Sequence, residues 1–371
     1  MSNAIRDQNL RTLSAFFAPE TRGPGGARLR AALFREDGVK QLCYPIPPEH
    51  TGQPQEFPAR DLLLHQPDCS CKLDLDCVIW ATEDPDRFRA ETIEQGPLSL
   101  CGRTGPFRGH SLHTFTFRDG LIQTWQVFPN TFTIYPTLGL EPADALAHLP
   151  EGAVQPPPLS EEAARALAEN ERRIAEELLP VLAVRSVTPV CSHGVRVRIK
   201  PYGVFLPEDE ALREKNRAAV QLYFDKAGRE ARGISRNDLF TEDGLTEIPM
   251  DHMAPLNPGH HAFPTRPGPS GSPLDPYWHT DVIRFDATAR PDMFWVETRS
   301  YHGEGAPEQP LPGMPTYTAK SYWNHYNFFF QLRDGKISYC REFLDPRSER
   351  RVMGIQETPL PEGALELYRY L

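Results

Sequence analysis

D-P-D-R-F-R-A-E-T (Asp84 to Thr92) and R-P-D-M-F-W-V-E-T (Arg290 to Thr298) are two versions of one nine-residue motif, set 206 positions apart. A second pair of stretches shares about this displacement: N-L-R-T-L-S-A-F-F begins at Asn9, and N-R-A-A-V-Q-L-Y-F begins at Asn216. Chance similarities would not keep a common spacing. The chain therefore contains an internal repeat.

Beyond this motif the displacement grows to 215 and stays there. R-D-G at residues 118–120 recurs at residues 333–335, and His110 corresponds to His325. One insertion in the second copy, around residues 304–315, accounts for the change. A period above 200 residues is too long for a stacked solenoid unit, so each copy should be a domain with its own core.

The pattern within each copy predicts helices first and a sheet afterwards. Residues 9–17 and 216–227 have the periodicity of amphipathic helices. Alternating, aromatic and β-branched stretches predict strands near 74–81, 87–95, 109–117 and 121–128, and near 280–287, 292–300, 320–332 and 336–344. Asp119-Gly120 and Asp334-Gly335 are typical two-residue hairpin turns. We expect an α+β protein of two tandem domains, each an antiparallel sheet with N-terminal helices.

These signals divide the chain into two domains and a linker. We expect the first domain over residues 1–140, a linker over 141–207 and the second domain over 208–371. A run of prolines at 156–158 ends the first copy, and Ser160 followed by two glutamates predicts a helix that reaches about Leu179 before Pro180.

Composition excludes several classes of protein. The 371 residues carry a net charge of -10, which opposes a nucleic-acid backbone, so no nucleic-acid partner is expected. No apolar run is long enough to span a bilayer and the N-terminus lacks a signal-peptide core, so we expect a cytoplasmic protein without a membrane partner. Seven scattered cysteines match no common zinc pattern, and no nucleotide-binding or hydrolase motif occurs. We therefore expect neither a metal nor a cofactor.

The second copy resembles the phenazine-biosynthesis A/B proteins, which have the nuclear-transport-factor-two-like, or SnoaL-like, fold. Seven short segments carry this resemblance in order and approximate spacing: residues 214–218, 239–244, 276–278, 294–297, 324–325, 334–337 and 341–343. The first copy resembles the same family more weakly, through the positions that it shares with the second.

The resemblance implies a fold, a partner and a chemistry. It implies cone-shaped domains, each a strongly curved sheet closed by helices around a pocket, and members that usually dimerise through the sheet. It also implies a role in secondary metabolism and antibiotic biosynthesis, in which condensation of two amino-ketone molecules is assisted by a glutamate on the last strand and a histidine near the pocket. The glutamate maps onto Glu342. The histidine does not map cleanly, because residues 249–278 are rebuilt here, and His260 or His261 is a candidate.

Counting outward from the Asp334-Gly335 turn predicts which residues share a face of the second sheet. The count pairs Phe329 with Cys340 and Asn327 with Glu342, and it places His325 beside them. Paired residues point to the same face, so these five should converge as a pocket in which Glu342 and His325 are catalytic. Trp278, His261 and Tyr301 complete the expected substrate-binding set. In the first copy the same count leaves only His110 as a titratable group, and Val127 replaces Glu342.

The leading hypothesis is an enzyme that assists imine formation or ring closure on a small biosynthetic intermediate. One alternative is a non-catalytic small-molecule binder, in which His325 and Asn327 only hydrogen-bond within the sheet. Another is an isomerase, dehydratase or aldol-type cyclase of the same fold. The two copies should pack as an intrachain pseudo-dimer, as a homodimer, or as both.

Overall fold

The computed structural model describes residues 2–22, 25–44, 54–65, 73–100, 103–129, 196–249, 261–269, 277–302 and 322–345. Contacts between residues divide the chain into two compact units. The helix expected over 160–179 and the insertion over 304–315 lie outside the described residues.

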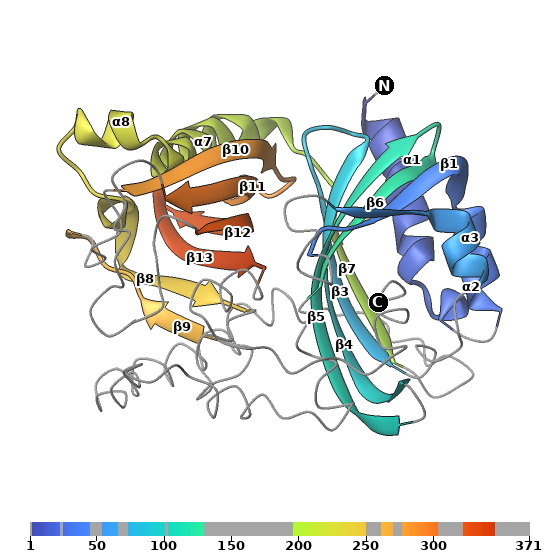
Figure 1. Cartoon of the computed structure of the whole chain (residues 1–371). Helices are drawn as coiled ribbons and strands as arrows, with labels where there is room; N and C mark the ends of the chain where they lie inside the picture. The colour runs from blue at the N-terminus through green and yellow to red at the C-terminus, as the bar shows by residue number, and fades with distance from the viewer. Residues whose placement is uncertain are drawn as a thin grey trace, which may run out of the picture. The chain divides into compact units, whose positions relative to one another are not determined.

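The first unit is a seven-stranded sheet with α-helices before its first strand and between its second and third strands (Figure 1). Its elements are α1 (Ser2–Phe17), η1 (Pro19–Thr21), α2 (Gly26–Ala32), β1 (Phe34–Leu42), β2 (Gln55–Pro58), α3 (Ala59–Leu64), β3 (Asp74–Ala81), β4 (Arg87–Leu100), β5 (Arg103–Arg118), β6 (Leu121–Pro129) and β7 (Val197–Tyr202). The strand order is β2-β1-β6-β5-β4-β3-β7.

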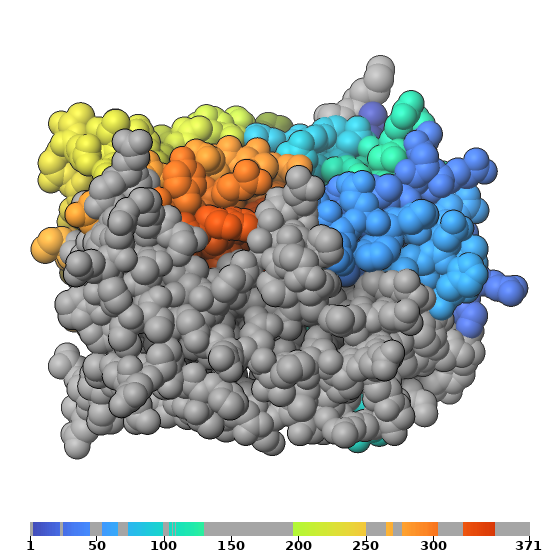
Figure 2. Space-filling model, viewed as in Figure 1, coloured from blue at the N-terminus to red at the C-terminus, as the bar shows by residue number. Residues whose placement is uncertain are grey.

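The second unit is a six-stranded sheet in the order β10-β11-β12-β13-β8-β9. Its elements are η7 (Pro207–Asp209), α7 (Glu210–Phe224), α8 (Lys226–Glu230), η8 (Asn237–Leu239), β8 (Phe240–Ile248), β9 (His261–Pro264), β10 (Trp278–Ala287), β11 (Met293–His302), β12 (Trp323–Arg333) and β13 (Lys336–Leu344). The helices α7 and α8, yellow to green, lie at the surface of this unit (Figure 2).

The two sheets have the same topology, which confirms the tandem repeat and the α+β class. Reading β3, β4, β5, β6, β1 and β2 across the first sheet gives the order of β10, β11, β12, β13, β8 and β9 in the second. The sheets are not purely antiparallel as expected, because β1 pairs with β6 and β8 with β13 in parallel. The first sheet has one additional strand: β7, from the segment expected to be linker, pairs in parallel with β3.

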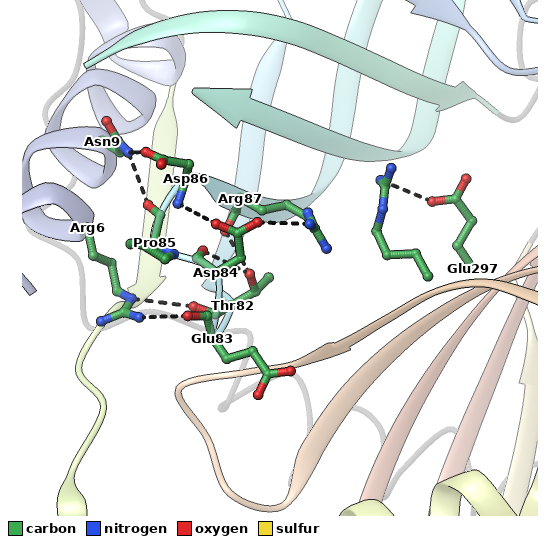
Figure 3. Close-up of polar contacts among 10 residues, drawn as sticks. Arg6, Asn9, Thr82, Glu83, Asp84, Pro85, Asp86, Arg87 and Glu297 are labelled. Carbon is green, nitrogen blue, oxygen red and sulfur yellow. Dashed lines mark hydrogen bonds and ion pairs between the residues drawn. The ribbon is translucent and has the colours of Figure 1, made fainter. Parts of the chain in front are cut away.

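The same two side chains fasten the first long helix to the sheet in both copies. In the first copy, Arg6 donates to the carbonyl of Thr82 at 3.4 Å and Asn9 to that of Pro85 at 3.0 Å (Figure 3). In the second, Arg213 donates to Thr288 at 3.3 Å and Asn216 to Pro291 at 2.9 Å. These four side chains are nearly fully buried. Buried polar groups need hydrogen-bond partners, and the carbonyl groups provide them, so polar residues can lie on the inner side of each helix.

Helix α7 buries one stripe against the second sheet. Its buried residues are Arg213, Asn216, Val220 and Tyr223, and the spacing of three or four residues puts them on one face. Val220 and Tyr223 join Phe328, Phe330 and Cys340 in the apolar core between helix and sheet. The α7 side of β12 and β13 is therefore the inner side of this unit.

The last hairpin of each copy has the predicted turn but not the predicted register. Both turns have positive φ at both central residues, at Asp119 and Gly120 and at Asp334 and Gly335, as a type I′ turn requires. One residue farther along, a β-bulge shifts the pairing by one position. In the second copy the bulge lies at Ser338, so Phe328 and not Asn327 pairs with Glu342. A shift of one residue moves side chains to the opposite face, so the expected convergence of His325, Asn327 and Glu342 is wrong.

Candidate functional site

Glu342 lies on the inner side of the second sheet, facing α7. Its cross-strand partner is Phe328, a core residue, and its Oε1 atom accepts a hydrogen bond from the Tyr223 hydroxyl at 3.4 Å. Tyr223 is 5% exposed and is held by edge-on ring contacts with Phe240, Phe328 and Phe330 at 5.0 to 6.3 Å. The carboxyl group therefore has a rigid, oriented donor beside it.

A pocket opens next to this pair. It has a volume of about 130 Å³ and is lined by Tyr223, Phe224, Lys226, Arg229, Arg236, Trp278, His279, Thr280 and Phe328. Glu342 borders the pocket through its two neighbours, Tyr223 and Phe328, which both line it. Aromatic rings and cationic groups dominate the lining.

Two of the pocket arginines have structural partners that fix their positions. The Arg236 guanidinium lies 5.5 Å from the Tyr223 ring centre and 5.9 Å from that of Trp278, in cation–π geometry. Arg229 donates to the carbonyl oxygen of Leu222 at 2.9 Å and to that of Tyr223, so it caps the carbonyl end of α7. Arg229 therefore holds the end of the helix that carries Tyr223.

Cys340 also lies on the inner side, opposite Phe330. Burial raises the pKa of its thiol well above the usual value, and the nearby Glu342 charge raises that pKa further, while Arg236 lowers it. A thiol with a raised pKa stays protonated and is a poor nucleophile near neutral pH. Cys340 therefore contributes volume and polarity rather than thiolate chemistry.

The structure separates the expected site residues into two groups. Glu342, Cys340 and Trp278 share the inner side. His325, Asn327 and Phe329 lie on the opposite side of the sheet, because the Ser338 bulge reverses the faces relative to the simple count. Tyr301 pairs with Trp323, and its ring stacks on the pocket residue His279 at 5.7 Å. His261 is the first residue of β9 and pairs with Ile248.

His325 belongs to a partly buried polar cluster around Glu297 on the opposite side. Its Nε2 atom lies 3.0 Å from Oε1 of Glu297, and Arg284 lies 3.3 Å from Oε2 of the same carboxylate. Glu297 is 3% exposed. The first copy has the same pair at the equivalent positions, His110 and Glu91, at 2.5 Å. Both copies keep this histidine–glutamate pair, although only the second copy has Glu342. The pair therefore indicates a role in the scaffold.

The Tyr223–Glu342 pair is present in one copy only. The equivalent residues of the first copy are Phe16 and Val127, so hydroxyl and carboxyl groups are both replaced by apolar side chains. The first copy instead has His113 on its inner side, opposite Val127. The expectation that His110 is the only titratable group on the face that matches Glu342 is therefore wrong, for the same reason: a bulge at Gln123 shifts the register.

Sequence reasoning missed Tyr223 and Arg236. Tyr223 lies on the inner stripe of α7, where an aromatic residue is most simply a core residue, and Arg236 lies in a connection without periodicity. The signal that could have identified Tyr223 is its match to Phe16 in the repeat. The two side chains differ only in the tyrosine hydroxyl, which is the group that reaches Glu342.

Known proteins match the second copy. The family model described as phenazine biosynthesis protein A/B matches residues 205–362. The phenazine biosynthesis protein PhzA of Pseudomonas fluorescens is 33% identical over 152 residues, which cover 41% of this chain and 85% of that protein. PhzA1 of Pseudomonas aeruginosa is 31% identical over 164 residues, or 44% of this chain and 92% of the relative. The chain belongs to the phenazine biosynthesis protein A/B family.

This family is one of secondary-metabolite biosynthesis, and its match falls on the copy that has Glu342. Among solved structures, the phenazine biosynthesis-related protein phzb2 of Pseudomonas aeruginosa has a TM-score of 0.33 and 24% identity, over 38% of this chain and 90% of that one. A protein from Jannaschia sp. CCS1 described as a putative SnoaL-like polyketide cyclase has a TM-score of 0.28 and 13% identity, over 35% of this chain and 92% of the other.

Two further findings concern the described ranges. No helix in them is long and apolar enough to cross a bilayer. They also contain no group of three or more histidine, cysteine, aspartate or glutamate side chains placed to hold a metal ion.

Proposed function

We propose that the second copy is a cofactor-independent enzyme of secondary metabolism that assists condensation or cyclisation between amine and ketone groups of a small biosynthetic intermediate. Glu342 transfers the proton. The observation that carries this proposal is the Tyr223–Glu342 contact at the border of an aromatic pocket, a pair that the first copy lacks.

The chemistry needs one group that can both take and give a proton. When an amine and a ketone form an imine, the nitrogen loses two protons and the carbonyl oxygen leaves as water. A carboxyl group beside the reacting atoms can accept a proton from nitrogen and deliver it to the departing oxygen. The Tyr223 hydroxyl donates to one carboxylate oxygen and so orients the other toward a reactant. The rigid aromatic walls hold the reactants together, which is the larger part of the expected rate gain.

A non-catalytic binding protein is the second candidate, alongside an isomerase, dehydratase or aldol-type cyclase that uses the same carboxyl group. The observation that favours the binder is Val127 at the position of Glu342, since it means that one copy of this scaffold is kept without the acid.

The test is Glu342→Gln in the full chain, assayed for loss of an amino-ketone by mass spectrometry. Glutamine keeps the size of the side chain and accepts the Tyr223 hydrogen bond, but it has no titratable proton. Turnover should fall by roughly 10² to 10⁴, the usual contribution of general acid–base catalysis. Unchanged turnover would remove the catalytic assignment.

Two variants are matched controls. Val127→Ala changes the equivalent residue of the first copy, so it should cost about 1 kcal/mol of stability and leave turnover unchanged. His325→Asn alters the opposite side of the sheet and should reduce turnover less than Glu342→Gln. Thermal melts of all three variants separate loss of chemistry from loss of folding.

We also propose that the two units pack against each other through their sheets, as an intrachain pseudo-dimer. Each sheet carries large apolar side chains on the side turned away from its helices: Val78, Leu112 and Phe128 in the first, and Trp295, Phe329 and Phe343 in the second. An apolar sheet face needs a partner surface in water. We also propose a cytoplasmic location, supported by the buried thiols of Cys77 and Cys340, which form no disulfide.

A further inference from the structure

The pocket next to Glu342 has room for one small ring. Its volume of about 130 Å³ is close to the roughly 150 Å³ of a protein cavity that holds a single benzene molecule. Two molecules of that size would need roughly 300 Å³, which is also where ordinary ligand pockets begin. The pocket therefore takes one small molecule and not two.

Ring contacts fix the walls of this pocket. The Phe224 ring lies 5.0 Å from that of Tyr223 and 5.2 Å from that of Phe328. Phe328 in turn stacks on Tyr326 at 5.4 Å, and the Tyr326 ring lies 5.8 Å from that of Trp278. Side chains packed at this density cannot separate without leaving gaps elsewhere in the core. Admitting a second molecule would therefore break several of these contacts.

Trp278 is held both by its N–H group and by the face of its ring. The indole N–H donates to the Thr280 hydroxyl at 2.9 Å, and that hydroxyl shares a hydrogen bond with Ser300 at 3.2 Å. The Arg236 guanidinium lies 5.9 Å from the ring centre. Trp278 is thus a fixed wall, and the size of the pocket is a property of the folded copy.

The charges of the lining suit a neutral amine. Lys226, Arg229 and Arg236 line the pocket, and none of its lining residues is an aspartate or glutamate. Positive neighbours disfavour a further positive charge, so they lower the pKa of an amine that binds there. The unprotonated amine is the form that attacks a carbonyl carbon.

The inner side of the first copy is filled by larger side chains. Trp125 takes the place of Cys340, and its neighbour Lys40 takes that of Thr246. Trp125 is 4% exposed and Lys40 is 0% exposed, and the Lys40 Nζ atom lies 4.3 Å from the centre of the Trp125 ring. The Phe16 ring also contacts Trp125, at 5.0 Å. We therefore expect one ligand molecule per chain, in the second copy.

We propose that the second copy binds one amino-ketone at a time and closes the imine within that molecule, so that the product is a cyclic imine with a single ring. This inference rests on the proposed function, and of condensation and cyclisation it selects cyclisation. The size of the pocket and the contacts that fix its walls support it. An amine and a ketone on one short chain also start close together, so the site has only to fold that chain.

The step is balanced within one molecule. The amine nitrogen forms a bond to the carbonyl carbon of the same molecule, and a proton moves from nitrogen to oxygen to give a ring alcohol. Glu342 delivers a proton to that oxygen, which leaves as water, and it takes the second proton from nitrogen as the C=N bond forms. Both protons of the amine end on the water, Glu342 is restored, and no oxidant or reductant is needed.

A binding experiment tests the size of the site without depending on turnover. The five tryptophans of the full chain are replaced by fluorotryptophan, and the Trp278 and Trp125 resonances are assigned in fluorine NMR spectra by single substitution with phenylalanine. Cyclohexanone should shift the Trp278 resonance along a saturable one-site curve and leave the Trp125 resonance in place. Decalone, which has two fused rings, should bind at least tenfold more weakly, although its larger apolar surface would favour binding if it fitted.

Phe224→Ala is the matched variant for size, because it enlarges the pocket at a side chain that is only partly buried. It should strengthen decalone binding at least tenfold relative to the parent and change cyclohexanone binding much less. Decalone that binds the parent at least as tightly as cyclohexanone, or cyclohexanone that leaves the Trp278 resonance unshifted, would overturn the proposal.

A pair of reactions tests ring closure. The full chain is given 6-aminohexan-2-one, which carries both groups, or an equimolar mixture of butylamine and butanone, and imine formation is followed by NMR. We expect acceleration of the first reaction only, and Glu342→Gln should remove it. Equal acceleration of both would overturn the proposal and leave the acid–base function standing. Size-selective binding with neither reaction accelerated would instead overturn the catalytic function, and ring closure with it.

Discussion

At the scale of single residues, the Tyr223 hydroxyl is the group that distinguishes the second copy from the first beside Glu342. Tyr223→Phe introduces the residue that the first copy has at Phe16, and it removes only the donor to Oε1. A donor to the carboxylate stabilises its charged form, so the variant should move the acidic limb of the pH–rate profile to higher pH. The loss in turnover should be roughly ten- to a hundredfold, since a hydrogen bond to a charged group contributes about 1.5 to 3 kcal/mol.

The pH–rate profile is the measurement that separates a positioning role for Tyr223 from a purely structural one. A purely structural role would lower stability or turnover and leave the limb where it is. Phe224→Leu, which alters the neighbouring pocket ring, is the control for changes in shape alone.

Lys40 gives a second prediction, for stability against pH. The folded state takes up the Lys40 proton only below about pH 7, whereas the unfolded chain takes it up below about 10.5. Between these values the unfolded chain binds more protons, so the free energy of unfolding increases as the pH rises. The destabilisation caused by burying Lys40 is therefore complete below pH 7 and disappears as the pH approaches 10.5. Lys40→Met should thus be more stable than the parent at pH 7, by a few kcal/mol at about 1.4 kcal/mol per pKa unit.

Chemical denaturation of both proteins at pH 7, 8.5 and 10 measures this difference. The contributions of other titrating groups cancel between the two proteins, which leaves the Lys40 contribution. A stability difference that stays constant across the three pH values would contradict a lowered pKa in the folded state.

At the scale of elements, the repeat and the alternation of side chains were enough to predict four strands in each sheet, β3 to β6 and β10 to β13. The parallel strands β1 and β8 were missed, because E-D-G in the middle of each interrupts the apolar alternation. The register of the last hairpins was missed because the bulges lie at Ser338 and Gln123. Neither residue is a glycine, which would have marked a bulge in the sequence. That single extra residue decided which predicted site residues lie together, so Glu342, Cys340 and Trp278 share a side while His325 does not.

The hairpin turn itself supports a stability prediction. Gly335 has φ of +80°, and a Cβ atom there would lie 2.9 Å from Cε of Lys215. Gly335→Ala should lower the free energy of unfolding by about 1 to 2 kcal/mol, chiefly through the left-handed backbone because the lysine chain can move aside. Gly335→Asn should lose less, since asparagine tolerates this conformation. Urea unfolding of the two variants measures the order, and equal losses would point to the side-chain contact instead.

At the scale of the whole molecule, the duplication predicts how the chain covers its sheets. The sequence could indicate two equivalent domains, because the matches keep their spacing, but the spacing says nothing about how one domain faces the other. The apolar side chains on the outer sheet faces, Trp295 and Phe128 among them, are a physical reason for the two faces to meet. Joining two copies in one chain raises their effective concentration to the millimolar range, so the association needs no second chain.

The pseudo-dimer can be tested with the full chain in solution. If the two sheets pack on each other, small-angle scattering should give one compact particle, near the radius of gyration of about 21 Å expected for a folded chain of this length. Light scattering should report one chain per particle at low concentration. Phe343→Lys and Phe128→Lys, one on each outer face, should each extend the particle or drive self-association, whereas Lys215→Glu on the helix side should do neither. Two well-separated lobes in the unmodified chain would rule out sheet-to-sheet packing and leave each face to be covered by another molecule.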